Sequence, residues 1–460
     1  MDKLLVADVV GLTPDLLQHM PRLRRLADTG SSAALDPLLP AVTCSMQSTF
    51  LTGLPPAGHG IVGNGWFFRD LGEVFLWRQH NRLVQGEKVW ETIRRHVPGY
   101  TVANVCWWYA MGASTDWTVT PRPIYYADGK KAPDFYARPP QLHHELREEL
   151  GEFPLFQYWG PTASLRSTEW IVGAARRLMP RADLTLAYLP HLDYDLQRYG
   201  PGTPEATRAA ADVDRALAPL LDDAERCGAR VVVLSEYGIT RADTPVDVNR
   251  VLRAEGLLEV YTQDEMEYLD PWASRAFAVA DHQVAHVYVA DPADLERVRA
   301  VCAGLPGVAE VLDRGGQAQV GLDHERAGEL VLVAEPTAWF TYYYWDDDDR
   351  APDFARGVEI HRKPGYDPAE LFFDPADRLV KARAALTLAR KTVGLRYAMK
   401  VVPLDPAPVR GTHGRLPLRD EEGPMVLCDR PGVLGERLAA TGVRDLLLDL
   451  VGVGSTAPVA

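Results

Sequence analysis

The strongest constraint on the fold is the alternation of short apolar segments with amphipathic ones. Short runs rich in Val, Leu and Ala are typical of buried parallel strands, and parallel strands need long crossover connections, usually helices. This order predicts an α/β fold with a mostly parallel sheet between helices. The predicted strands are 4–10, 33–39, 101–109, 184–189 and 231–238, and the predicted helices are 14–30, 45–52, 164–179 and 204–227.

Two regions depart from this alternation. Residues 110–160 are rich in Pro, Tyr and Trp and indicate an irregular, cap-like insert. A second strand–helix–strand pattern with a β-rich end predicts a small α+β insertion at 261–375. The remaining ranges, 1–260 and 376–460, are predicted to form one core, as a chain of 460 residues allows.

Charge and composition exclude several classes of protein. The net charge of −14 argues against a nucleic-acid surface, which needs clustered Lys and Arg. Five scattered cysteines without a CxxC pair suggest neither a disulfide framework nor a thiolate zinc site. No apolar run approaches the roughly 18 residues of a membrane span, and the opening MDKLLVADVVGL is typical of a core strand rather than a signal peptide. We expect a cytoplasmic enzyme; the sequence does not determine its oligomeric state.

The segment PAVTCSMQSTFLTGLPPAGHGIVGN, residues 40–64, carries the chemistry. Thr43 stands directly before a predicted helix, where free backbone N–H groups and the helix dipole favour an anion. A hydroxyl at this point can attack phosphorus if a metal ion lowers its pKa. Taken alone, Thr43 is better explained as a helix N-cap.

Further motifs favour Thr43 as a nucleophile over Thr43 as a helix N-cap. After P-x-x-T come T-G-L-x-P and H-G-I-V-G-N, and the chain also holds VADVVGL, PHLDYDLQRYGP, VVVLSEYG and RGTHGRLP in order. Together they resemble the type I phosphodiesterase and nucleotide pyrophosphatase family of the alkaline phosphatase superfamily. The resemblance runs through most of the chain and implies an alkaline-phosphatase-like core.

The resemblance implies a role for each matching residue. Asp8 would ligate one metal ion, which the Thr43 hydroxyl also contacts, and Asp193 and His413 would ligate a second. Asn64 would donate a hydrogen bond to a phosphoryl oxygen as charge develops. The implied reaction is attack by Thr43, a phosphothreonine intermediate, and its hydrolysis by water. Two cations about 4 Å apart can hold both the attacking and the leaving oxygen.

Three expected ligand positions differ from the family pattern. Gln197 and Tyr237 stand where the family has histidines, and Glu236 replaces an aspartate. Losing two imidazoles moves the ligand set from one suited to zinc toward hard oxygen donors. We therefore expect one or two ions of Zn, Mn, Mg or Fe, with one position weak or empty as the alternative.

Other histidines are candidate substitutes for the lost imidazoles. His282 and His286 stand in VADHQVAHVYV, and His361 stands in VEIHRKPGYDP. Histidines on strands more often pack in the core than bind metal, so for each of these three residues a metal-binding role is the less favoured interpretation.

These residues predict hydrolysis of a phosphodiester, pyrophosphate or phosphomonoester of a small molecule. The aromatic stretches 100–126 and 153–170 could stack a planar group. One alternative is a catalytically weak protein of the same fold that binds a phosphorylated ligand, as the lost ligands suggest. Another is a phosphonate hydrolase. A sulfatase is disfavoured because threonine cannot form the aldehyde hydrate of that class.

Overall fold

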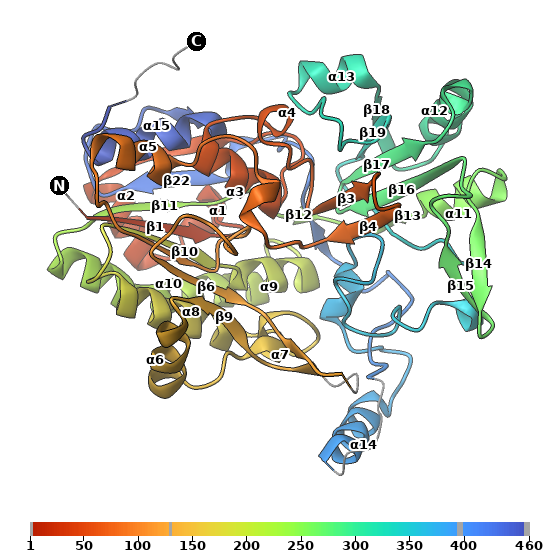
Figure 1. Ribbon diagram of the computed structural model, residues 1–460, viewed down its shortest axis with the longest axis horizontal. Coiled ribbons are helices and arrows are strands. Elements are labelled where there is room, and N and C mark those ends of the chain that lie inside the picture. Colours follow the sequence, from red (N-terminus) through yellow and green to blue (C-terminus); the bar gives the residue numbers. More distant parts are fainter. Residues whose placement is uncertain (1–2, 128–130, 393–398, 455–460) are drawn as a thin grey trace.

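Nine strands from both ends of the chain form one central sheet (Figure 1) in the computed structural model, which describes residues 3–127, 131–392 and 399–454. Across the sheet the strands are β23 (Arg437–Ala439), β2 (Ser31–Asp36), β22 (Met425–Cys428), β11 (Arg230–Leu234), β1 (Leu4–Val9), β10 (Leu184–Leu189), β5 (Val102–Val105), β6 (Trp117–Pro121) and β9 (Phe135–Arg138). Only β22 and β9 run antiparallel to their neighbours, so the sheet is mostly parallel, as the sequence predicted.

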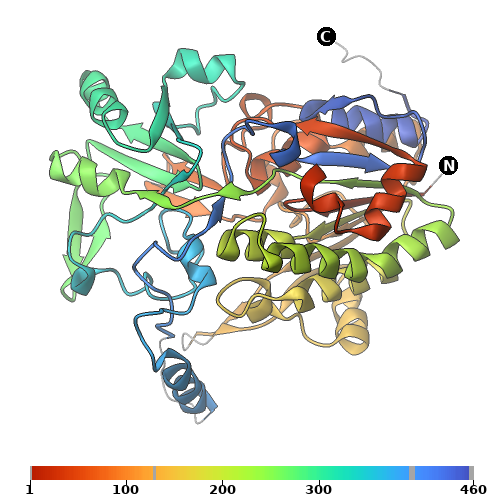
Figure 2. The ribbon, with the colours of Figure 1, turned by 180° about the vertical axis from the view of Figure 1, so that it is seen from behind.

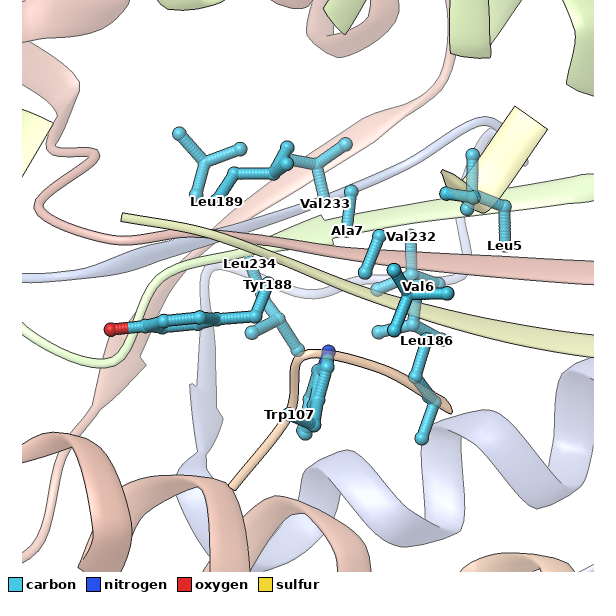
Figure 3. Packing of buried hydrophobic residues seen from close by; sticks show 14 of the residues in the cluster. Leu5, Val6, Ala7, Trp107, Leu186, Tyr188, Leu189, Val232, Val233 and Leu234 are labelled. Carbon is cyan, nitrogen blue, oxygen red and sulfur yellow. The ribbon is translucent and has the colours of Figure 1, made fainter. Parts of the chain in front are cut away.

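The centre of the sheet is β1, which pairs in parallel with β10 on one side and β11 on the other. All six residues of β1 are buried, as expected for a strand covered on both faces. Figure 3 shows Leu189 and Val233 on one face of these strands, and Tyr188 and Trp107 on the other. The core therefore lies on both sides of the sheet.

Helices cover the two faces of the sheet (Figures 1 and 2). One layer holds α2 (Pro21–Thr29), α6 (Pro140–Leu150), α8 (Leu165–Leu178), α9 (His191–Tyr199) and α10 (Pro204–Arg226). The other holds α3 (Thr43–Thr52), α5 (Val89–His96) and α15 (Val443–Leu450).

Helix α10 illustrates how the sequence specifies this layer. Thr203 caps its N-terminus by accepting a hydrogen bond from the Ala206 N–H, and Pro204 occupies the first helical position. Its buried residues recur at spacings of three and four, which places them on one face of the helix. That face packs against α2, α8, α9 and β11.

A smaller antiparallel sheet lies within the predicted insertion. Its strands, in spatial order, are β16 (Ala276–Asp281), β17 (Val284–Val289), β19 (Leu330–Ala334) and β18 (Val308–Leu312). The surrounding elements are β12 (Thr240–Arg241), β13 (Thr244–Val246), α11 (Val248–Ala254), β14 (Val260–Gln263), β15 (Met266–Leu269), α12 (Leu295–Ala303), α13 (Arg314–Gln319), β20 (Ala338–Phe340) and β21 (Gly411–Thr412). The hairpin of β3 (Gly65–Phe68) and β4 (Glu73–Leu76) also packs here, through the contact of Phe67 with Phe277, although it lies within the predicted core range.

Two predicted segments have a different structure. The helix expected over 14–30 is split into α1 (Pro14–Leu17) and α2, because Pro21 cannot continue a helix and instead begins the second one. The stretch 110–160 is less irregular than expected: it contributes β6, β9 and α6, together with the short strands β7 (Ile124–Tyr125) and β8 (Lys131–Ala132) and the short helix α7 (Leu155–Tyr158). Its Pro and aromatic residues obscured the underlying pattern.

One helix stands apart from both sheets. Figures 1 and 2 show α14 (Val380–Thr392) projecting at the lower edge of the molecule. Of the helices that the structure describes, none combines the length and the apolar character that a membrane span requires.

Candidate active site

The predicted site residues meet at the carboxyl edge of the three central strands. Asp8 is the fifth of the six residues of β1, Glu236 and Tyr237 follow the end of β11, and Asp193 lies in the first turn of α9, directly after β10. Carboxyl ends of adjacent parallel strands share one edge of the sheet, which is where open α/β sheets bind ligands. The topology therefore brings together four residues that span 230 positions of the chain.

Thr43 is the first residue of α3, which begins two residues earlier than the predicted helix at 45–52, and the N-cap position is taken by Val42 in extended conformation. The Thr43 hydroxyl lies 3.1 Å from the Tyr237 hydroxyl. The Tyr237 hydroxyl donates in turn to Asp193 Oδ1 at 3.3 Å. An ionised Asp193 can only accept, so Tyr237 then donates to it and Thr43 is the donor in the first contact. In that state the two bonds form a directed path from Thr43 to Asp193.

A buried pair of carboxyl groups lies beside Thr43. Asp8 and Glu236 are fully buried, and the Gln47 side-chain N–H groups reach both, at 3.2 Å to Asp8 Oδ2 and 2.7 Å to Glu236 Oε1. The Gln47 carbonyl accepts from the Trp108 backbone N–H at 2.7 Å, which fixes the orientation of the amide. Asp8 Oδ1 and Glu236 Oε2 have no hydrogen-bond partner.

Burial dominates the electrostatics of these acids. It raises the pKa of Asp8 to about 7, and it raises the pKa of Glu236 well above its ordinary value, with the neighbouring Asp8 charge as a second cause. It also raises the pKa of Asp193 to about 7 and keeps Tyr237 a neutral phenol by raising its pKa. Within the described part of the chain, no Lys or Arg side chain forms an ion pair with any of the three carboxyl groups.

Gln197 and His413 complete the surroundings of Asp193. The Gln197 amide N–H donates to Asp193 Oδ2 at 2.8 Å, and its carbonyl accepts from the Tyr366 hydroxyl at 2.8 Å. His413 Nε2 lies 3.7 Å from Asp193 Oδ1, and its ring stacks on the Tyr237 ring with centroids 3.5 Å apart. Burial lowers the pKa of His413 well below its ordinary value, so its imidazole is neutral.

Asn64 is held from two sides. Its carbonyl accepts from the Cys44 N–H at 3.0 Å, while its backbone N–H and side-chain N–H donate to the two oxygens of Asp281 at 2.7 and 3.0 Å. Asn64 does not line the cavity described below, and the Cys44 N–H at the start of α3 is already used. A contact between Asn64 and a phosphoryl oxygen therefore stays a prediction, which depends on the one side-chain hydrogen that Asp281 leaves free.

The three candidate histidines have separate surroundings. His282, at the turn between β16 and β17, joins the site: its Nδ1 lies 2.8 Å from Asp281 Oδ1, and its ring stacks between Tyr366 and His413. His286 is not available as a ligand, because both ring nitrogens bond to backbone groups, those of Val62 and Gly328. His361 lines the outer part of the site, where its Nδ1 contacts a backbone carbonyl.

The backbone of His282 adopts φ 61°, in the left-handed region. That conformation is uncommon for residues other than glycine and is often found at functional sites. It turns the chain between two strands of the smaller sheet so that His282 faces Tyr366 and His413.

A cavity of about 730 Å³ opens above Thr43. Its floor is polar and consists of Thr43, Asp193, Tyr237, His282 and His413. Its walls are largely aromatic and apolar: Trp77, Trp108, Phe156, Tyr158, Trp159, Tyr366, Phe354, Val358, Ile360, Phe373, Met399 and Val401. The cavity draws on the main sheet, the smaller sheet and the segment around α14.

The donor set can be compared with what a metal ion requires. Among the described residues, no three or more His, Cys, Asp and Glu side chains are grouped so as to hold a metal ion. Asp8 and Glu236 do offer two partnerless buried oxygens beside the Thr43 hydroxyl, which also contacts Glu236. Two carboxylates and a hydroxyl are hard oxygen donors, and they fit a cation such as Mg²⁺ or Mn²⁺.

Gln47, Asp281 and Tyr366 belong to this network and were not foreseen from the sequence. Gln47 lies four residues after Thr43 on α3, and that spacing places both on one face of the helix. Asp281 precedes His282 at the end of a buried strand, where a carboxyl group is costly without a partner. Both signals were available in the sequence.

The fold, together with the position of the site at the carboxyl edge of the main sheet, defines the class of protein to which the chain belongs. The architecture is shared with phosphonoacetate hydrolase from Sinorhizobium meliloti in complex with phosphonoformate, with a TM-score of 0.61 and 16% identity over 98% of this chain and 96% of that one. It is also shared with an inactive variant of murine ectonucleotide pyrophosphatase/phosphodiesterase 5 in complex with AMP, with a TM-score of 0.58 and 15% identity over 99% of this chain and 96% of that one. The fold is thus alkaline-phosphatase-like, as predicted.

The sequence places the chain within this class. It belongs to the type I phosphodiesterase / nucleotide pyrophosphatase family, whose model matches residues 4–367. It is also 24% identical over 289 residues to an uncharacterized pyrophosphatase/phosphodiesterase of Schizosaccharomyces pombe, covering 58% of this chain. The match covers 47% of that protein, so the chain spans about half the length of this curated relative. The family and these names support the phosphohydrolase class that the sequence predicted.

Proposed function

We propose that the protein hydrolyses a phosphate ester of a small molecule, with Thr43 as the nucleophile and a phosphothreonine intermediate. The observation that carries this proposal is the position of the Thr43 hydroxyl. It stands at the start of α3 and lines a cavity of about 730 Å³. It is hydrogen-bonded to the Tyr237 hydroxyl, through which its proton can reach Asp193.

The chain itself supplies the route for that proton. As the Thr43 oxygen bonds to phosphorus, its hydrogen passes to the Tyr237 oxygen, and the Tyr237 hydrogen passes to Asp193. The bond from phosphorus to the ester oxygen breaks as the bond to Thr43 forms, and the departing alcohol takes its proton from water. A pKa of about 7 suits Asp193 to accept the Thr43 proton at neutral pH. Asp193 returns that proton through Tyr237 to the Thr43 oxygen when a water molecule, which loses a proton to the solvent, displaces this oxygen from phosphorus. A cation held by Asp8, Glu236 and Thr43 would favour the ionised form of the Thr43 hydroxyl.

The walls of the cavity indicate the class of ester. Trp77 and Trp108 lie with ring centroids 4.9 Å apart, and Trp159 and Tyr366 lie 5.8 Å apart. Such walls favour an apolar or aromatic group on the phosphate, which would be largely removed from water. The cavity size corresponds to a drug-sized group, larger than the acetate part of phosphonoacetate.

Hydrolysis of paired synthetic esters tests this proposal. We expect turnover of naphthyl and nitrophenyl phosphate esters and diesters, with kcat/KM at least 10-fold above that of matched methyl esters, because each buried methylene contributes about 0.8 kcal/mol. Thr43→Ala should abolish turnover, and mass spectrometry of acid-quenched wild type should find phosphate on Thr43. The control is Thr52→Ala, on the same helix but bonded only to local backbone groups.

The outcomes separate the candidate functions. Wild-type rates in Thr43→Ala would refute the nucleophile assignment. Binding of the esters without turnover of any of them would favour the phospho-ligand-binding protein. Turnover of phosphonoacetate in preference to all esters would favour the phosphonate hydrolase.

A further inference from the structure

We infer that this site takes one divalent cation rather than two, held by Asp8, Glu236 and Thr43, and that hydrogen bonds of the chain itself close the second position. This inference rests on the proposed function, since it concerns the same site. It goes beyond the family resemblance, which implies a pair of ions.

The first position has the features of a cation site. Asp8 and Glu236 are fully buried and each keeps one oxygen without a partner. Gln47 binds only their other oxygens, at 3.2 and 2.7 Å, and its neutral amide cannot offset their charge. Buried carboxylates without a counter-charge are unfavourable by several kcal/mol. A cation between the two free oxygens would remove that penalty.

The second position has few donors on its acidic side. Asp193 would be its charged ligand, but both oxygens of Asp193 already accept protein hydrogen bonds. Gln197 donates to Oδ2 at 2.8 Å and Tyr237 donates to Oδ1 at 3.3 Å. The Tyr237 hydroxyl thus lies between Thr43 and Asp193 and is hydrogen-bonded to both.

The Gln197 amide cannot replace the missing imidazole in this arrangement. Its carbonyl oxygen, the only atom with which it could bind a metal, accepts from the Tyr366 hydroxyl at 2.8 Å. Turning the amide over would set that carbonyl against the Asp193 carboxylate at 2.8 Å, which is repulsive. The orientation is therefore fixed by its two neighbours.

His413 is the remaining donor at the second position. Its Nδ1 bonds to the Ala41 carbonyl at 2.9 Å, so it carries the hydrogen, and Nε2 keeps its lone pair. The ring is held between the rings of Tyr237 and His282, with centroids 3.5 and 3.8 Å away. One neutral imidazole and one carboxylate that already accepts two hydrogen bonds are fewer ligands than the three or four that the protein usually supplies to a structural or catalytic ion.

Metal stoichiometry tests the inference without reference to activity. The full-length chain is freed of metal with a chelator, dialysed, and titrated with Mn²⁺ and separately with Zn²⁺ by calorimetry, with bound metal counted by mass spectrometry. We expect one ion per chain. Glu236→Gln should lose it, with at least a 100-fold rise in Kd, while keeping the far-ultraviolet circular dichroism of the wild type.

A gain-of-binding variant makes the second position testable. Replacing both closing residues, Gln197→His with Tyr237→His, should raise the count from one ion to two. Gln263→His adds an imidazole at an exposed position of β14 and should leave the count at one. Two ions in the wild type, none in the wild type, or an undiminished ion in Glu236→Gln would each overturn the inference.

The two proposals fail in different ways. One bound ion in a protein that cleaves no ester would refute the proposed function and leave the stoichiometry intact. Two bound ions in an active phosphohydrolase would refute only the single-ion inference.

Discussion

Replacing Asp281 by alanine tests whether this carboxylate organises the site from the smaller sheet. Asp281 accepts three hydrogen bonds, from the Asn64 backbone N–H, from the Asn64 side chain and from His282 Nδ1, at 2.7, 3.0 and 2.8 Å. At about 1.5 kcal/mol for each bond to a charged acceptor, these bonds contribute roughly 4.5 kcal/mol.

Part of that contribution is offset by the cost of burying the charge. The pKa of Asp281, raised from 3.8 to about 6, is the net result of burial and of the Asn64 hydrogen bonds, so the ionised side chain gains less than these bonds alone would give. Removing the side chain leaves buried N–H groups of Asn64 and His282 without a partner, at a cost of about 1 to 3 kcal/mol for a buried donor. We therefore expect Asp281→Ala to lower the free energy of unfolding by about 2 kcal/mol at pH 7.

Urea unfolding followed by tryptophan fluorescence measures this change. The control is Asp323→Ala, at an exposed position, which should stay within about 0.5 kcal/mol of the wild type. Since Asn64 is a partner of Asp281, the double variant with Asn64→Ala should be less destabilised than the sum of the two single variants by about 1.5 to 3 kcal/mol. Additive effects, or a single-variant change below about 0.5 kcal/mol, would refute the reasoning.

Two further predictions concern buried charge. In metal-free protein, Asp8 and Asp193 titrate at about 7 when folded and near 3.8 when unfolded, so the native state binds more protons between these values and the free energy of unfolding should fall as pH rises from 4 through 7. Chemical unfolding at pH 5.5 and 8 measures this, and Mn²⁺ should flatten the dependence; greater stability of the metal-free protein at pH 8 would contradict it. Lys363→Met leaves Asp367 and Glu370, each 2.7 Å from the buried ammonium, without a counter-charge, and should cost about 3 to 5 kcal/mol in a urea titration. A loss below about 1 kcal/mol would show that the cluster is not held by this charge.

The parts of the fold that depend on local pattern could be predicted from the sequence. The buried run of β1, the identical bounds of β10 at Leu184–Leu189 and the capped start of α10 at Pro204 all follow from hydrophobicity and capping. The junction at Thr43 was also predictable, because a strand-to-helix turn fixes it. Family motifs then gave the order in which the site residues occur.

The hydrogen-bond network could not be predicted in the same way. Whether Gln197 presents its carbonyl or its N–H groups depends on Tyr366, which lies 169 residues further along the chain. Tyr237 was expected as a metal ligand, but its surroundings make it a donor to Asp193. Such choices depend on which partners meet in three dimensions, and residue spacing carries no information about them.

Because His282 lies at the tip of the β16–β17 hairpin, both the main sheet and the smaller sheet contribute residues to the candidate site. The elements of the main sheet position Thr43 and the buried acids, and the smaller sheet supplies Asp281, which binds Asn64 and His282. Separating the two sheets by a few ångströms would break those bonds while leaving each hydrophobic core intact. A substitution far from Thr43, at a contact between the smaller sheet and the main sheet, can therefore disrupt the candidate site without unfolding the chain.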